Sequence, residues 1–137
     1  MAECIFCKII KGEMPAHRVY EDDEVLAFLD ISPINQGHVL VVPKEHSDNL
    51  LETPEELVEK LAVIVGKIGK AVKASTNADG INIGINNGAA AGQVIFHTHI
   101  HVIPRFENDG YKLWGSDKQY ELGEAERVAQ KIREQIK

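Results

Sequence analysis

Three of the six histidines in this 137-residue chain stand at alternate positions of one apolar stretch, "HTHIHVIPR", at residues 97–105. Successive side chains of a β-strand point to opposite faces, so a strand here would gather His97, His99 and His101 on one face. The Thr, Ile and Val between them would share the other face. A single histidine is more often structural than reactive, whereas three in strict alternation favour chemistry.

Two kinds of chemistry suit such a face. In the first, His-x-His on a strand supplies ligands to a catalytic zinc ion, as in metal hydrolases. In the second, a neutral imidazole attacks phosphorus and forms a covalent nucleotidyl-histidine that water later cleaves. The second chemistry needs a phosphate cradle, a proton donor for the leaving group and a partner that fixes the tautomer. The stretch itself carries no carboxylate pair of the kind that a water-activating metal site often uses.

The segment "NNGAAAGQ", residues 86–93, leads directly into the histidine stretch and is a candidate cradle. Gly88 and Gly92, with only alanines between them, can bring backbone N–H groups close to a ligand. By composition alone the segment is typical of a flexible turn. Its position beside the histidines is what favours phosphate binding.

The only two cysteines, Cys4 and Cys7, form a C-x-x-C motif near the N-terminus. A disulfide framework built on one pair is not expected in a cytoplasmic protein. A redox C-x-x-C follows a strand and opens a helix, and the few residues before Cys4 leave no room for that strand. Metal binding is therefore favoured, ahead of inert packing.

The rest of the sequence predicts the elements that must position these residues. A long amphipathic helix begins at "TPEE", with Thr53 as N-cap and Pro54 at the first helical position, and continues to Val72. Within it, Gly66 and Gly69 allow another backbone to approach closely. Shorter helices are expected in 4–12 and 121–137. Five strands are expected, two in 17–31 with a hinge at 21–23, and one each in 37–44, 80–86 and 97–105. Short strands with separate helices indicate an α+β fold with a five-stranded antiparallel sheet.

Length and charge limit the function. A chain of this size is about one domain, and we expect a single domain over 1–137, with a core at 4–105 and a C-terminal tail and helix at 106–137. The net charge of -6 argues against non-specific nucleic-acid binding as the main function. No stretch approaches the roughly 20 apolar residues that cross a bilayer, and no secretion signal is recognised. We therefore expect a cytoplasmic protein with neither nucleic-acid nor membrane partners.

Residues 97–103 resemble the signature of the histidine triad (HIT) family, in which hydrophobic residues separate and follow three histidines. Thr98 is the only position that is not plainly hydrophobic. The stretches 4–33, 37–46 and 86–93 are similar, in the same order, to the histidine triad nucleotide-binding proteins. This resemblance runs from Cys4 through Arg105 and implies the HIT-like form of the α+β fold, and a homodimer.

The resemblance implies a role for each matching residue. His99 corresponds to the nucleophile that attacks the α-phosphate, and His101 to the histidine that contacts the phosphate and leaving group. His38 corresponds to the histidine that hydrogen-bonds into the triad, and Asp30 to the carboxylate that holds the ribose hydroxyls. The remaining nucleotide-binding matches are the apolar base slot, Ile5, Phe6, Ile9, Phe28 and Ile31, and the phosphate loop, Asn86, Gly92, Gln93 and Val94. Val94 stands where relatives usually carry Ser or Thr, and the lost hydrogen bond, roughly 1 kcal/mol, predicts slower chemistry and an altered leaving-group preference.

The resemblance also gives the cysteines partners. Relatives with the C-x-x-C bind zinc through both cysteines, a later histidine and the first histidine of the triad, which here are Cys4, Cys7, His46 and His97. Four protein ligands leave no open position, so one structural zinc per chain is implied, with no organic cofactor. The alternative, a catalytic zinc, would place the metal on His99 and His101.

The function implied is hydrolysis of nucleoside 5′-monophosphate derivatives at the α-phosphate, with phosphoramidates and adenylates as substrates. Purine nucleotides such as AMP or GMP derivatives are the expected ligands. A dinucleoside polyphosphate hydrolase is the nearest enzymatic alternative. A nucleotide-binding regulatory protein with incidental hydrolysis is the alternative from another class.

Overall fold

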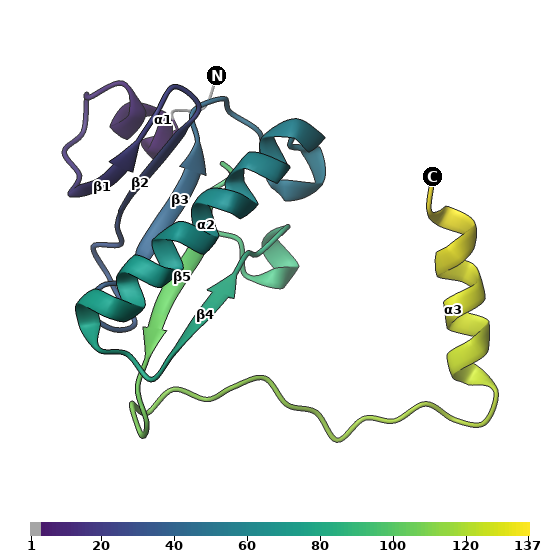
Figure 1. Ribbon diagram of the computed structural model, residues 1–137. Helices are drawn as coiled ribbons and strands as arrows, with labels where there is room; N and C mark the ends of the chain where they lie inside the picture. Colours follow the sequence, from purple (N-terminus) through teal and green to yellow (C-terminus); the bar gives the residue numbers. More distant parts are fainter. Residues whose placement is uncertain (1–3) are drawn as a thin grey trace.

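The computed structural model describes residues 4–137, so the first three residues of the predicted domain lie outside the described part. Five antiparallel strands form one sheet in the order β1-β2-β3-β5-β4 (Figure 1). The strands are β1 (Arg18–Glu21), β2 (Val25–Leu29), β3 (Val39–Pro43), β4 (Gly80–Gly84) and β5 (Ile100–Arg105). The helices are α1 (Ile5–Ile10), α2 (Glu55–Thr76) and α3 (Glu124–Gln135), with short 3-10 turns at Leu50–Glu52 and Ala89–Ala91. The predicted α+β class with an antiparallel sheet is confirmed.

Both faces of the central strands are buried, and a different helix covers each face. Val25, Val41 and Val102 share one apolar cluster with the buried stripe of α2. Leu26, Leu40 and the α1 residues Phe6 and Ile9 belong to a second cluster on the other face. This explains why β2 and β3 are apolar throughout instead of alternating with polar residues.

Helix α2 begins one residue later than the sequence predicts. Pro54 is the N-cap, because its carbonyl accepts from the N–H groups of Leu57 and Val58, each at 3.0 Å. The predicted N-cap, Thr53, uses its hydroxyl elsewhere. It donates to the carbonyl of Asn49 at 2.8 Å and lies 2.9 Å from the hydroxyl of Thr98. The cap prediction was wrong because a buried tertiary partner took the hydroxyl.

The histidine stretch is a strand only from its fourth residue onward. β5 begins at Ile100, because the N–H of Thr98 donates to the carbonyl of Ser47 at 2.9 Å and not to a neighbouring strand. The alternation of faces nevertheless holds. The Thr98 side chain points to Thr53 before α2, whereas the rings of His99 and His101 lie 5.1 Å apart on the opposite face.

The C-terminal part leaves the sheet after β5. Asp109 fixes its root, since this carboxylate accepts two hydrogen bonds from Arg105, each at 2.8 Å. An extended segment then leads to α3, which stands apart from the sheet in Figure 1. Among the residues described, no helix is long and apolar enough to cross a membrane.

Candidate functional site

The ring of His99 is held so that one nitrogen keeps a free lone pair. Its Nδ1 lies 2.7 Å from the carbonyl oxygen of His97, and a carbonyl can only accept, so Nδ1 carries the proton. In the neutral ring the lone pair is therefore on Nε2. His99 is 9% exposed, and the ring of Phe6 packs edge-on against its ring with the two ring centroids 5.1 Å apart. A fixed tautomer with an available lone pair is what a nitrogen nucleophile requires.

A second chain of contacts fixes the tautomer of His101. The N–H of Ile34 donates to Nδ1 of His38 at 3.1 Å, so the proton of neutral His38 is on Nε2. That Nε2–H donates to Nδ1 of His101 at 2.9 Å. Neutral His101 consequently carries its own proton on Nε2. Nδ1 is thus committed to His38, and Nε2–H can serve a ligand as a donor.

Both of these histidines are neutral near pH 7. Burial lowers the pKa of His101 to about 4, helped by the neighbouring His99 and His38. Burial also lowers the pKa of His38, although the Asp30 carboxylate opposes this shift. His38 and His101 are therefore neutral imidazoles, which agrees with the tautomers that their hydrogen bonds impose.

Asp30 lies at the edge of this group. Its Oδ1 accepts from the N–H of Ser32 at 2.9 Å, and its Oδ2 lies 3.6 Å from Nε2 of His38. Ligand atoms of Asp30, His38 and His101 lie within 4.8 Å of one another, a spacing at which a metal ion can bind. A metal there would need the lone pair of His38 Nε2, yet the Ile34 N–H requires the proton on that nitrogen. The contacts favour a hydrogen-bond relay over a catalytic metal.

The residues predicted for the base slot are only partly brought together. Phe6 and Phe28 are buried with their ring centroids 5.6 Å apart, and Ile9 joins them in the second apolar cluster. Ile5 of α1 is 42% exposed and is not part of that cluster. Ile31 is 88% exposed beyond the end of β2.

The predicted phosphate loop, 86–93, is shaped by two glycines and one buried amide. Gly88 and Gly92 have φ of 92° and 97°, a backbone conformation that favours glycine. The Oε1 of buried Gln93 accepts from the N–H of Gly88 at 2.8 Å. Its Nε2 donates to the carbonyl of Asp48 at 2.5 Å and to that of Ile95 at 3.0 Å. The amide of Gln93 thus builds the loop.

The two other predicted loop residues lie at its surface. Asn86 crosses the loop, with its Nδ2 at 3.5 Å from the carbonyl of Gly92. Val94 is 84% exposed and follows the loop directly. Because Gln93 is fully occupied, the backbone N–H groups and Asn86 are the loop's candidates for contact with a phosphate.

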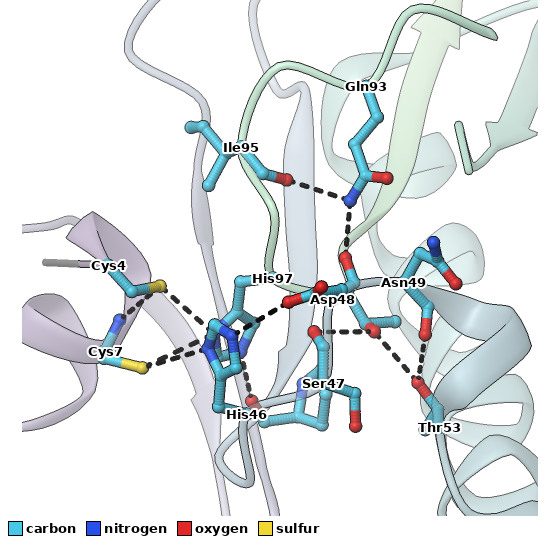
Figure 2. A network of polar contacts seen from close by, with 12 residues as sticks. Cys4, Cys7, His46, Ser47, Asp48, Asn49, Thr53, Gln93, Ile95 and His97 are labelled. Carbon is cyan, nitrogen blue, oxygen red and sulfur yellow. Dashed lines mark hydrogen bonds and ion pairs between the residues drawn. The ribbon is translucent and has the colours of Figure 1, made fainter. Parts of the chain in front are cut away.

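Cys4, Cys7, His46 and His97 form a four-ligand cluster (Figure 2). The two histidine Nδ1 atoms are 3.1 Å apart. The Nδ1 of His97 lies 3.3 Å from the sulfur of Cys4 and 3.6 Å from that of Cys7, and the Nδ1 of His46 lies 3.4 Å from the sulfur of Cys7. Tetrahedral zinc with ordinary bond lengths separates two nitrogens by about 3.3 Å and a sulfur from a nitrogen by about 3.6 Å. The cluster therefore has the donor atoms of a zinc site, at separations close to those that the ion requires.

The surroundings of the cluster also suit a cation. Nε2 of His97 lies 2.8 Å from the carbonyl of Pro43, so its Nδ1 keeps a lone pair for the metal. Nε2 of His46 lies 3.4 Å from the Asp48 carboxylate, so the Nδ1 of His46 also keeps a lone pair for the metal. Burial lowers the pKa of His97, and burial with the nearby Cys4 raises the pKa of the Cys7 thiol. A metal cation supplies the charge that a thiolate there needs.

Sequence reasoning missed three residues that support these groups. Asp48 faces His46, Asn87 accepts from the N–H of Leu50 at 2.9 Å, and Thr53 meets Thr98. The only signal available for Asp48 was a carboxylate two residues after a candidate ligand.

Comparison with known proteins agrees with this geometry. The family model described as the HIT domain matches residues 11–108. The chain is 50% identical over 115 residues to the protein named adenylylsulfatase HINT3 from Arabidopsis thaliana, covering 84% of this chain and 57% of that protein. It resembles the crystal structure of a histidine triad nucleotide-binding protein from Candida albicans, with 34% identity, TM-score 0.86 and 96% of each chain covered. A zinc-bound histidine triad family protein from Mycobacterium smegmatis is similar at 43% identity and TM-score 0.76, over 84% of each chain.

Proposed function

Since this chain belongs to the HIT domain family, we propose that it is a nucleotide-binding hydrolase that cleaves nucleoside 5′-monophosphate derivatives at the α-phosphate. The observation that carries the proposal is the pair of fixed tautomers. They give His99 a lone pair on Nε2 and His101 a proton on Nε2, with the two rings 5.1 Å apart. The name of the Arabidopsis protein, an adenylylsulfatase, supports hydrolysis, and the name of the Candida protein supports nucleotide binding.

The proposed reaction has two displacements at one phosphorus. Nε2 of His99 attacks the α-phosphorus, and the bond to the leaving group breaks with its electron pair on the leaving atom. Water then attacks the same phosphorus, and Nε2 regains its electron pair as the nucleoside 5′-monophosphate leaves. The proton from water passes to solvent, so the net change is hydrolysis. The hydrogen bond of Nδ1–H to the His97 carbonyl stabilises the positive charge on the substituted ring.

The leaving group decides how much proton transfer the site must supply. Sulfate leaves an adenylyl sulfate as a stable anion, so the Nε2–H of His101 only has to donate a hydrogen bond. An amine leaves a phosphoramidate only with a proton, which a His101 ring protonated on both nitrogens would deliver from Nε2, returning to the neutral form. We include both substrate classes in the proposal, with Asp30 holding the ribose hydroxyls as charged acceptor.

Two structural features complete the proposal. One zinc per chain is held by Cys4, Cys7, His46 and His97, and it ties α1 to the segment before β5. The protein is a homodimer, whose partner covers the exposed edge of β4. Support for this surface comes from Ile83 and Val63, 55% and 59% exposed, and from Gly66, where an added Cβ would meet no atom within 4 Å.

The test is turnover of adenylyl sulfate and adenosine 5′-phosphoramidate by pure protein, with release of AMP measured by chromatography. The proposal expects turnover of at least one substrate and its near-complete loss in His99→Ala, while AMP binding persists. Tight AMP binding with no turnover of either substrate would replace it by the regulatory alternative.

A further inference from the structure

The segment 46–50 contacts both the metal cluster and the phosphate loop (Figure 2). It begins with the ligand His46, and two residues later Asp48 places its carboxylate 3.4 Å from the His46 ring. The carbonyl of the same Asp48 accepts from Nε2 of Gln93 at 2.5 Å. One residue thus joins a metal ligand to the amide that shapes the loop.

A second contact joins the segment and the loop independently. The N–H of Leu50 donates to Oδ1 of Asn87 at 2.9 Å. On the loop side, Gln93 is 4% exposed and accepts from the N–H of Gly88, so a shift of the segment is passed to the loop backbone. The side chains of Gln93 and Asn87 therefore link the loop to the segment that carries His46.

We propose that zinc at the four-ligand cluster sets the affinity of the phosphate loop for a nucleotide phosphate, acting through the segment 46–50. The inference rests on the proposed function, because it takes 86–93 as the phosphate site. With zinc bound, His46 is fixed and Asp48 with it. Without zinc, the half-exposed His46 side chain loses its strongest restraint, and the loop must be ordered when phosphate binds. Asn87 and Gln93 are positioning residues in this account.

The coupling predicts a difference between two ligands. AMP and adenosine share the base and ribose, and only AMP reaches the loop. Removing zinc should weaken AMP binding by about fivefold to thirtyfold, the equivalent of one or two neutral hydrogen bonds, and leave adenosine binding nearly unchanged. Calorimetric titration of zinc-loaded and zinc-free protein with each ligand measures this difference. Equal losses for AMP and adenosine would mean general loosening and would overturn the proposal.

The variant Asn87→Ala distinguishes the route through segment 46–50 from a second route through His97. Zinc also binds His97, whose carbonyl orients His99, so metal could act on the phosphate through that ring. Asn87→Ala removes the hydrogen bond between the loop and the N–H of Leu50. It should weaken AMP binding to the zinc-loaded protein and shrink the effect of zinc removal, because the two changes act on one connection. An unchanged zinc effect in this variant would assign the coupling to His97 and contradict our route.

Asn49→Ala is the matched control. Its Oδ1 also accepts from a backbone N–H of the same 3-10 turn, that of Leu51 at 3.0 Å, whereas the loop contact of this turn is made by Asn87. This variant should keep the wild-type AMP affinity and the wild-type zinc effect. A loss equal to that of Asn87→Ala would show that any weakening of the turn produces the result.

A reciprocal measurement needs no folded zinc-free protein. By linkage, AMP must raise zinc affinity by the same factor by which zinc raises AMP affinity. Competition with a chelator should show tighter zinc in the presence of AMP than of adenosine. Equal zinc affinities with the two ligands would refute the coupling. If the zinc-loaded protein binds no AMP at all, the proposed function fails, which is a distinct outcome.

Discussion

The low pKa of His101 predicts that pH changes the choice between two leaving groups. Burial lowers this pKa to about 4, so the ring is neutral at pH 7 and gains its second proton as pH falls. About one ring in a thousand is protonated at pH 7 and about one in ten at pH 5. An amine needs this proton and sulfate does not. The kcat/KM for phosphoramidate divided by that for adenylyl sulfate should rise about tenfold for each pH unit between 7 and 5.

The ratio is the useful quantity, because both substrates react with the same nucleophile, so any effect common to both reactions cancels. Each kcat/KM is taken from initial rates of AMP release in buffers of constant ionic strength. In His101→Ala the slope of the ratio should vanish. A slope that persists would assign the proton to the substrate itself, and a ratio independent of pH in the wild type would refute the role of His101.

Three further predictions concern individual parts of the site. Asp30→Ala should lower AMP affinity by about tenfold to a hundredfold, the value of a charge-assisted hydrogen bond, and equal affinities in a titration would contradict the ribose assignment. Cys7→Ser should lose zinc by elemental analysis and about 2.7 kcal/mol of unfolding free energy when zinc exceeds its Kd a hundredfold; unchanged denaturant unfolding would argue against a structural metal. Gly66→Leu should shift sedimentation from dimer to monomer with the far-UV spectrum retained, whereas an unaffected dimer would exclude this surface.

The sequence predicted what depends on local pattern. The apolar periodicity of 57–72 located α2, and alternation placed His99 and His101 on one face because side-chain direction persists even where strand pairing stops. The strand's start was missed, since the backbone of Thr98 bonds to Ser47 and no local pattern encodes that choice. Thr53 was misassigned for the same reason, because its partner Thr98 lies far along the chain.

The candidate site needed more than pattern. Cys4 and His97 are separated by most of the chain, and only family resemblance paired them before the structure placed their ligand atoms 3.3 Å apart. The tautomers depend on three backbone groups, the Ile34 N–H and the carbonyls of Pro43 and His97. Because backbone N–H and carbonyl groups occur along the whole chain, the sequence does not single out these three. Which ring nitrogen is reactive can therefore be identified only from the three-dimensional structure.

The stereochemical course at phosphorus distinguishes a covalent nucleotidyl-His99 from direct attack by water. The substrate is an adenylyl derivative that is chiral at the α-phosphorus through isotopic oxygen or sulfur, and the product AMP analogue is analysed by phosphorus NMR. Two in-line displacements, first by Nε2 of His99 and then by water, predict overall retention of configuration. Inversion would show that water attacks the substrate directly and would contradict the account.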